Sequence, residues 1–205
     1  MSAAGARDVL VYVGPDTTDP KEGIHRFRLD LATGALRPVG QTLGVPDPFY
    51  LTIDPAKRRL YAANAVDELD GQPGGAISAF AIDRATGDLT FLNRQPARGK
   101  LPCYLSIDRA GQTLLTGNYN SGSVAALPIG ADGRLGPATA AFQHEGSGPN
   151  AQRQAGPHVH CIVLDPAERY AFAADLGTDE VKAYRFDARA GSLTPADPPA
   201  TRVHA

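Results

Sequence analysis

The sequence predicts an all-β fold of repeated four-stranded antiparallel units, and three observations support that prediction. A Pro-x-Tyr-Leu-Ser/Thr-Ile-Asp pattern at residues 48–54 recurs at 102–108, with a looser copy at 160–165. Period-2 runs such as 76–83 have the alternation of a strand with one buried face. No window shows the 3.6-residue apolar period of an amphipathic helix.

Each unit places its elements in the same order. The repeated pattern precedes a charged turn and a short apolar strand, which ends in Asn64, Asn118 or Asp175. A period-2 strand and a hairpin turn follow, and then a fourth strand. The turns are Thr33-Gly34, Thr86-Gly87, Asp132-Gly133 and Ala190-Gly191, where Gly supplies the positive φ that tight hairpins need. Four short antiparallel strands in about 40 to 50 residues predict a β-propeller blade.

The repeat predicts one partial propeller domain, 1–205, with about four blades and boundaries near residues 58, 112 and 168. The last unit ends in the stretch 198–205, which begins with two prolines, so we expect it to lack its closing strand. Complete propellers contain about four to eight blades. We therefore expect an incomplete ring, the N-terminal fragment of a longer chain, with an uncovered blade face that favours self-association.

Composition excludes several classes of partner. The formal net charge is -2, and basic and acidic residues are scattered along the chain, which argues against binding to nucleic acid or to an anionic membrane. No leader sequence or long apolar run is evident, so a cytoplasmic protein is expected. Cys103 and Cys161 are too few for a disulfide framework and are expected to be buried structural thiols.

Reactive side chains concentrate between residues 153 and 179. Arg153, His158 and His160 lie outside the common blade pattern. Arg153 lies within the longest insertion of the repeat, residues 145–156, and the two histidines follow it. In a strand, His158 and His160 would point the same way, which could direct both imidazoles at one cavity. Either one is a candidate general base, and Arg153 is a candidate contact for a developing oxyanion or a substrate phosphate.

Five more residues are candidates for substrate binding. Gln154, Asn118 and Tyr119 could add neutral hydrogen bonds, and His144 opens the polar loop that leads to Arg153. Asp175 occupies the repeat position of Asn64 and Asn118, so a turn role and a role at the site both remain open. The alternative is a structural role, in which His158 and His160 are loop residues of the blade that form hydrogen bonds with neighbouring Asp residues.

Taken together, the motifs resemble the seven-bladed propeller lactonase family, whose best-known activity is 6-phosphogluconolactonase. The resemblance covers nearly the whole chain and rests on Tyr12-Val13-Gly14, 74–80, 102–106, 118–124, Arg153-Gln154, 157–160 and 175–179. It implies hydrolysis of a sugar lactone such as 6-phosphogluconolactone, in the pentose phosphate pathway. It also implies that roughly the last three blades, with their site residues, are missing.

Two positions depart from the family pattern. Pro15-Asp16 replaces a Tyr-Thr pair, and Asn64-Ala65 replaces an Asn-Glu pair, so a carboxylate of the family's channel is absent. His158, His160 and one Asp would suffice for an open zinc site, but the resemblance implies no dependable metal. No metal or cofactor is therefore expected. Two alternatives remain open: a muconate-lactone cycloisomerase of the same fold, and a propeller module that binds a ligand or protein without catalysis.

Overall fold

The computed structural model describes residues 8–17, 19, 23–69 and 71–203, and all regular elements within these ranges are β-strands. The first sheet contains β1 (Asp8–Val13), β2 (Gly23–Asp30) and β3 (Leu36–Leu43). The second contains β4 (Pro48–Ile53), β5 (Arg59–Asn64), β8 (Ala76–Ile82) and β9 (Leu89–Pro96), with the small hairpin β6 (Glu68–Leu69) and β7 (Gln72–Pro73) inserted before β8.

Two further four-stranded sheets complete the structure. The third contains β10 (Pro102–Ile107), β11 (Thr113–Asn118), β12 (Ser123–Pro128) and β13 (Ala140–Gln143). The fourth contains β14 (Val159–Leu164), β15 (Tyr170–Asp175), β16 (Glu180–Asp187) and β17 (Ser192–Arg202). Neighbouring strands of these sheets pair antiparallel, which confirms the all-β prediction, and three of the four sheets have the four strands expected of a blade.

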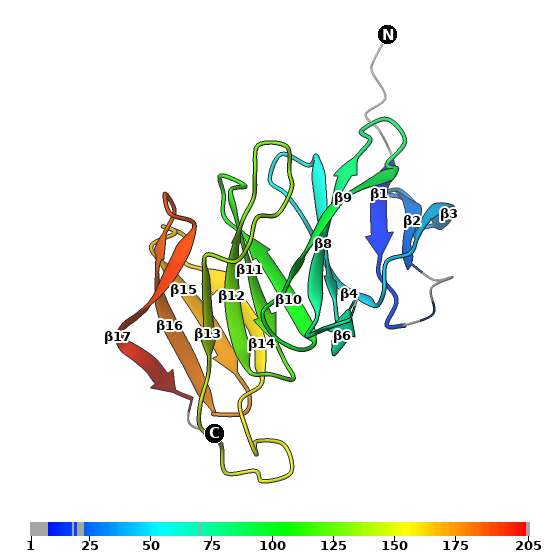
Figure 1. The fold of residues 1–205 in the computed structure, drawn as a ribbon. Helices are drawn as coiled ribbons and strands as arrows, with labels where there is room; N and C mark the ends of the chain where they lie inside the picture. Colours follow the sequence, from blue (N-terminus) through cyan, green and yellow to red (C-terminus); the bar gives the residue numbers. More distant parts are fainter. Residues whose placement is uncertain (1–7, 18, 20–22, 70, 204–205) are drawn as a thin grey trace.

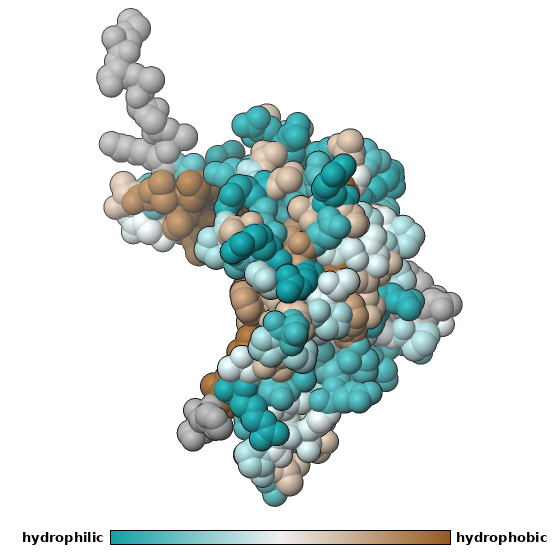
Figure 2. All heavy atoms as spheres, turned by 90° about the vertical axis from the view of Figure 1, so that its left-hand side faces the viewer, coloured by the Kyte–Doolittle hydropathy of each residue, from teal (hydrophilic) through white to brown (hydrophobic). Residues whose placement is uncertain are grey.

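The sheets stand side by side in chain order, from β1 at one end to β17 at the other (Figure 1). The first strands of successive sheets, β4, β10 and β14, contact one another, so these strands line the inner side of the arrangement. The arc is open, and Figure 2 shows apolar side chains along the hollowed side of its outline. The partial ring expected from the repeat is therefore confirmed.

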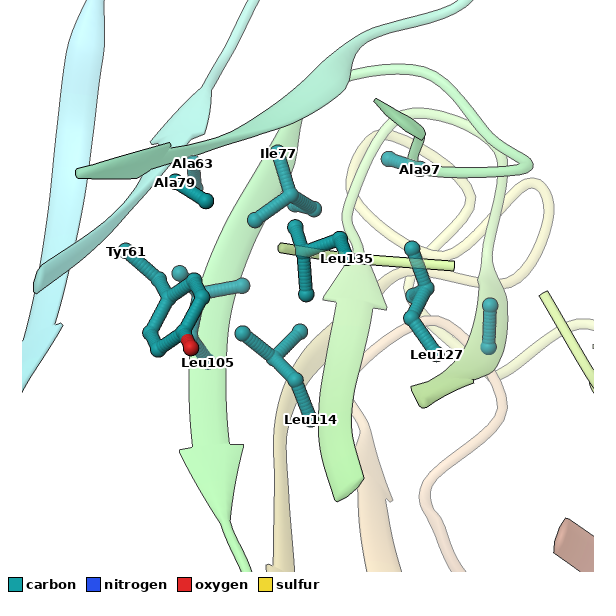
Figure 3. Packing of buried hydrophobic residues seen from close by; sticks show 10 residues of the cluster. Tyr61, Ala63, Ile77, Ala79, Ala97, Leu105, Leu114, Leu127 and Leu135 are labelled. Carbon is teal, nitrogen blue, oxygen red and sulfur yellow. The ribbon is translucent and has the colours of Figure 1, made fainter. Parts of the chain in front are cut away.

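Side chains between neighbouring sheets form the core. Between the second and third sheets, Tyr61, Ile77, Leu105, Leu114 and Leu127 pack together and are almost fully buried (Figure 3). Burying one such aliphatic or aromatic side chain contributes about 1.5–3 kcal/mol. A second cluster lies between the third and fourth sheets. Because each sheet interface has its own cluster, the blades are held rigidly enough to position loops at their ends.

Two details differ from the sequence prediction. The predicted blade boundaries near residues 58, 112 and 168 fall in turns between the first and second strands of a sheet. The chain instead passes from one sheet to the next at residues 44–47, 97–101 and 144–158. The last unit does not lack its closing strand, because β17 pairs with β16. Its prolines are accommodated since β17 is an edge strand and its register shifts between the pairs Lys182↔Ala200 and Tyr184↔Pro195. The three-stranded sheet is the first one.

The inner strands share a β-bulge at one position. Phe49, Cys103 and His160 are each the extra residue in the pairing of β4 with β5, β10 with β11 and β14 with β15. A bulge leaves one residue unpaired and redirects its side chain. The same backbone irregularity therefore carries an aromatic ring, a thiol and an imidazole in successive blades.

The two outermost sheets each leave an apolar face exposed. Val163 and Phe172 of the fourth sheet are both 39% exposed, and Val9 and Val13 of the first are 40% and 43% exposed. Cys103, in contrast, is buried, and its burial raises the pKa of the thiol to about 11. Cys161 is half-buried, and neither cysteine forms a disulfide. Within the described ranges, no helix has the length and apolarity needed to cross a membrane.

Candidate functional site

Tyr119 is the centre of the candidate site. It follows β11 at the turn into β12, and its backbone N–H donates to the carbonyl of Leu101. The His158 ring stacks on the Tyr119 ring, with centroids 4.7 Å apart, and the His160 ring meets it at right angles at 5.8 Å. Arg153 donates from Nη2 to the Tyr119 hydroxyl oxygen over 3.1 Å. The structure thus brings together Arg153, Tyr119, His158 and His160.

The orientation of His158 is fixed at both its backbone and its ring. Its backbone N–H donates to Asp175 Oδ1 over 2.8 Å, and its carbonyl accepts from Leu176 N. Its Nδ1 lies 3.0 Å from the backbone carbonyl oxygen of Tyr119. Because a carbonyl only accepts hydrogen bonds, Nδ1 carries the proton, and in the neutral ring Nε2 keeps its lone pair. The neutral form of His158 is therefore the Nδ1–H tautomer, with its lone pair on Nε2.

His160 reaches the same ring from the bulge of β14. Its side chain is exposed and contacts Tyr119 edge-on. The sequence predicts that both imidazoles point at one place because they alternate along a strand. They do meet at Tyr119, but His158 precedes β14 and His160 is the bulged residue, so simple alternation is not the cause.

Gln154 anchors the loop that carries Arg153. Its side chain is buried, and Nε2 donates to the carbonyl of Leu176 and to Asp179 Oδ1. Its Oε1 accepts from the backbone N–H of Asn150. Both ends of the amide are therefore used within the protein, and Gln154 holds residues 148–156 against the 176–179 turn instead of facing a ligand.

His144 and Asp175 form a buried network below the site. His144 Nδ1 lies 2.6 Å from Asp175 Oδ2, and Nε2 lies 2.8 Å from the Tyr184 hydroxyl. The side chains of His144 and Asp175 are 2% and 0% exposed. The carboxylate accepts a hydrogen bond from Nδ1–H, so Nε2 accepts a hydrogen bond from the Tyr184 hydroxyl. Neither residue is placed to contact a substrate directly, contrary to their candidate role.

The carboxylate of Asp175 remains ionised despite its burial. Burial raises its pKa, but the hydrogen bonds from His144 and from the backbone N–H groups of His158 and Gly177 outweigh this effect and lower it overall. Burial and the nearby charge of Asp175 raise the pKa of Tyr184, so this hydroxyl keeps its proton. A buried carboxylate with several donors is a stable anchor for the backbone around it.

Asn118 has a structural position of the same kind. It is fully buried, and its Nδ2 donates to the carbonyl of Ala97 over 3.0 Å and to Ser123 Oγ over 3.1 Å. Asn64 donates in the same way to the carbonyl of Pro46. Asn64, Asn118 and Asp175 thus each hold the chain that arrives from the preceding blade. The turn role that the sequence predicts for Asp175 agrees with this arrangement, and Asn118 does not reach the surface.

The Arg153 guanidinium and the Tyr119 hydroxyl place hydrogen-bond donors next to each other. Its hydroxyl oxygen accepts from Arg153, so the hydroxyl proton remains available to a further acceptor. The guanidinium, which is exposed, keeps other N–H groups available. The cluster therefore combines a neutral imidazole base with donors suited to a developing negative charge. A pocket of about 420 Å³ at the opposite end of the blades, lined by Asp54, Arg59 and Arg109 among others, contains none of these residues.

The structure also adds residues that the sequence does not single out. Tyr184 lies in an ordinary alternating strand, and nothing in the pattern shows that its hydroxyl meets His144. Gly177 is part of a recognised motif, but its role is steric. A Cβ there would lie 1.9 Å from the carbonyl oxygen of Gly156 and 2.8 Å from His158 N. Only glycine allows the segment before β14 to lie so close to the 175–179 turn.

Comparison with known proteins relates this geometry to a family. A family model described as "Lactonase, 7-bladed beta-propeller" matches residues 10–205. A 6-phosphogluconolactonase of Bacillus subtilis is 37% identical over 183 residues, which are 89% of this chain and 50% of the relative.

Solved structures give the same result. A Bacteroides fragilis structure, provisionally assigned as a 6-phosphogluconolactonase, superposes with a TM-score of 0.89 at 33% identity, covering 100% of this chain and 57% of that one. A periplasmic gluconolactonase of Pseudomonas aeruginosa superposes with a TM-score of 0.87 at 32% identity, covering 96% of this chain and 55% of that one. The chain spans about half the length of the relatives it matches. It belongs to the seven-bladed β-propeller lactonase family.

Proposed function

We propose that the protein hydrolyses the lactone of a sugar acid, with 6-phosphogluconolactone as the substrate. The observation that carries the proposal is the assembly of Arg153, His158 and His160 around Tyr119. The names of its relatives, 6-phosphogluconolactonase and gluconolactonase, support the choice of substrate class. Participation in the pentose phosphate pathway and a cytoplasmic location are parts of the same proposal.

The reaction follows from the tautomer of His158. Water attacks the lactone carbonyl carbon as it transfers a proton to Nε2 of His158, whose Nδ1–H stays bonded to the Tyr119 carbonyl. The carbonyl oxygen becomes an oxyanion, which the Arg153 guanidinium and the Tyr119 hydroxyl stabilise through hydrogen bonds. The carbonyl then re-forms and the ring C–O bond breaks. The proton moves from Nε2 to the ring oxygen, which becomes the hydroxyl of the free acid.

His160 has a secondary role in this scheme. It has no fixed ring hydrogen bond among the described contacts, and it meets Tyr119 only by its edge. An exposed, weakly held imidazole is a poorer base than one with an oriented Nε2. We therefore assign proton transfer to His158 and substrate contact to His160.

The test is enzyme kinetics on matched variants. We expect His158→Gln to lower kcat/KM for lactone hydrolysis by about 10²–10⁴-fold, since a positioned general base contributes this much. We expect Arg153→Gln to lower it by about 100-fold through loss of oxyanion stabilisation. His25→Gln, in the first sheet, is the control and should leave turnover unchanged. Rates must be corrected for the spontaneous opening of the lactone.

The choice of substrate is tested with a pair of lactones. If Arg153 also contacts a substrate phosphate, Arg153→Gln should raise KM for 6-phosphogluconolactone more than KM for gluconolactone. Unchanged turnover in His158→Gln would refute the assignment of the base. Turnover of muconolactone alone, or of no lactone, would refute the proposed substrate.

A further inference from the structure

We infer that Asp175 is the positioning residue of the site, because one buried carboxylate orients both the imidazole base and the loop that carries Arg153. This inference rests on the proposed function for its kinetic consequence. Its structural part stands independently, since it concerns contacts within the chain.

Asp175 holds His158 through the backbone of that residue. Asp175 Oδ1 accepts the backbone N–H groups of His158, Gly177 and Thr178 at 2.8, 2.9 and 3.3 Å. The His158 carbonyl accepts from Leu176 N. Both backbone groups of His158 are thus held by the same turn, and this places the ring on Tyr119. Without the carboxylate, three N–H groups, two of them in buried contacts, would lose this acceptor.

Asp175 also positions Arg153, through the turn that it organises. The turn that Asp175 organises presents the Leu176 carbonyl and the Asp179 carboxylate to the Gln154 amide. A Cβ at Gly148 would lie 2.5 Å from Gln154 Cδ, so the loop closes tightly around this side chain. Arg153 directly precedes Gln154 and reaches the Tyr119 hydroxyl. The position of Arg153 therefore depends on the turn as well.

The identity of residue 175 separates this blade from the others. At the equivalent positions, Asn64 and Asn118 donate to the backbone carbonyls of Pro46 and Ala97. In the fourth blade the partner from the preceding chain is the His144 imidazole, and the residue is a carboxylate that only accepts. Asn fulfils the anchoring role in the second and third sheets, and Asp replaces it in the fourth sheet, next to the connecting segment that carries Arg153 and His158.

The experiment compares two carboxylates of the same blade. Asp165 accepts the backbone N–H groups of Ala167, Arg169 and Tyr170, but at the opposite end of β15. Asp165→Ala is therefore the matched control for Asp175→Ala. Lactone kinetics report on catalysis. NMR of the His158 ring protons reports on positioning, because the Tyr119 ring shifts their resonances upfield.

The expected results differ clearly between the two variants. Asp175→Ala should lose the upfield shift of His158 and lower kcat/KM about 100-fold, since misplacement of a catalytic group by about 1 Å has this effect. Asp165→Ala should lower thermal stability but keep the shift and keep kcat/KM within about twofold of the native value. Asp175→Asn, which retains the Oδ1 acceptor but presents an amide N–H to His144 in place of Oδ2, should keep more of the shift and activity than Asp175→Ala and less than the native protein.

If Asp175→Ala does not fold, Gln154→Ala distinguishes the effect on the Arg153 loop from the effect on the His158 ring. It should lower kcat/KM and keep the upfield shift of His158, because it releases only the Arg153 loop. The inference is overturned if Asp175→Ala keeps the His158 shift, if Asp165→Ala has the same effects, or if Gln154→Ala leaves kcat/KM unchanged. If His158→Gln retains full turnover, the proposed function fails, and the NMR shift still decides whether Asp175 positions the ring.

Discussion

Replacement of His144 by leucine should reveal how much the buried network stabilises the fold. Leucine is close to histidine in volume, so His144→Leu removes the imidazole without a large cavity. It breaks the contacts with Asp175 Oδ2 at 2.6 Å and with the Tyr184 hydroxyl at 2.8 Å. Both former partners, Asp175 and Tyr184, are buried.

The cost follows from the groups that lose their partner. A buried neutral hydroxyl without a partner costs about 1–3 kcal/mol, and loss of a hydrogen bond to a charged carboxylate costs about 1.5–3 kcal/mol. Asp175 keeps its backbone donors, and the leucine gains some apolar burial. We therefore expect a loss of about 3–5 kcal/mol, a large part of the about 5–15 kcal/mol by which domains are usually stable. The control Tyr184→Phe removes one contact and should cost about 1–2 kcal/mol.

Acid should reduce the difference between the native protein and His144→Leu. The pKa of Asp175 is lowered below its ordinary value of 3.8 in the folded protein. Its stabilising contribution is therefore present above that pH and is lost as the pH falls through the folded-state pKa. In His144→Leu the hydrogen bond that lowers the pKa is gone. The difference in unfolding free energy should be largest near neutral pH and shrink below about pH 4.

Urea unfolding followed by far-UV circular dichroism measures both effects. The chain has no tryptophan and seven tyrosines, so intrinsic fluorescence is the weaker probe. A cost below about 1 kcal/mol at neutral pH would contradict the calculation from buried partners. A cost that stays constant from neutral pH to pH 3 would show that the ionised carboxylate is not involved.

Two further predictions concern backbone packing and association. Gly177→Ala should destabilise the fold by about 1–3 kcal/mol, because the new Cβ would lie 1.9 Å from a backbone oxygen; Gly156→Ala, where a Cβ meets nothing within 4 Å, should change the urea midpoint little. Self-association through the exposed face of the fourth sheet should weaken in a Val163→Lys/Phe172→Lys double variant. Sedimentation over a range of concentrations measures this, and unchanged association would place the contact elsewhere.

The sequence could predict the blades because each strand has a local signal. Alternation, Gly-containing turns and the repeat spacing all act over a few residues, and they give the correct fold class. The closing strand was the exception. Its prolines indicated an irregular end, but β17 pairs on one side only and bulges between Pro195 and Ala200, so few of its N–H groups are needed.

The candidate site was only partly predictable. Arg153, His158 and His160 stood outside the repeat and do meet at one place, at Tyr119. Gln154, however, lies in a polar loop, where burial leaves no local pattern. Its orientation depends on contacts with residues more than twenty positions away, which short-range spacing does not encode. The polar residue types in the sequence therefore indicated where the site lies. They did not indicate which of these side chains are buried and which are exposed.

The bulge at the inner strand has a consequence for how such a protein can change. Phe49, Cys103 and His160 are outside the pairing ladder of their blades, so a replacement there removes no rung of the sheet. Neighbouring positions such as Val159 and Ile162 are fully buried and tolerate little variation. In the second and fourth sheets, where Phe49 and His160 are exposed, this residue can vary with little effect on folding, whereas Cys103 of the third sheet is buried. Substrate preference could diverge at that residue while the scaffold stays the same.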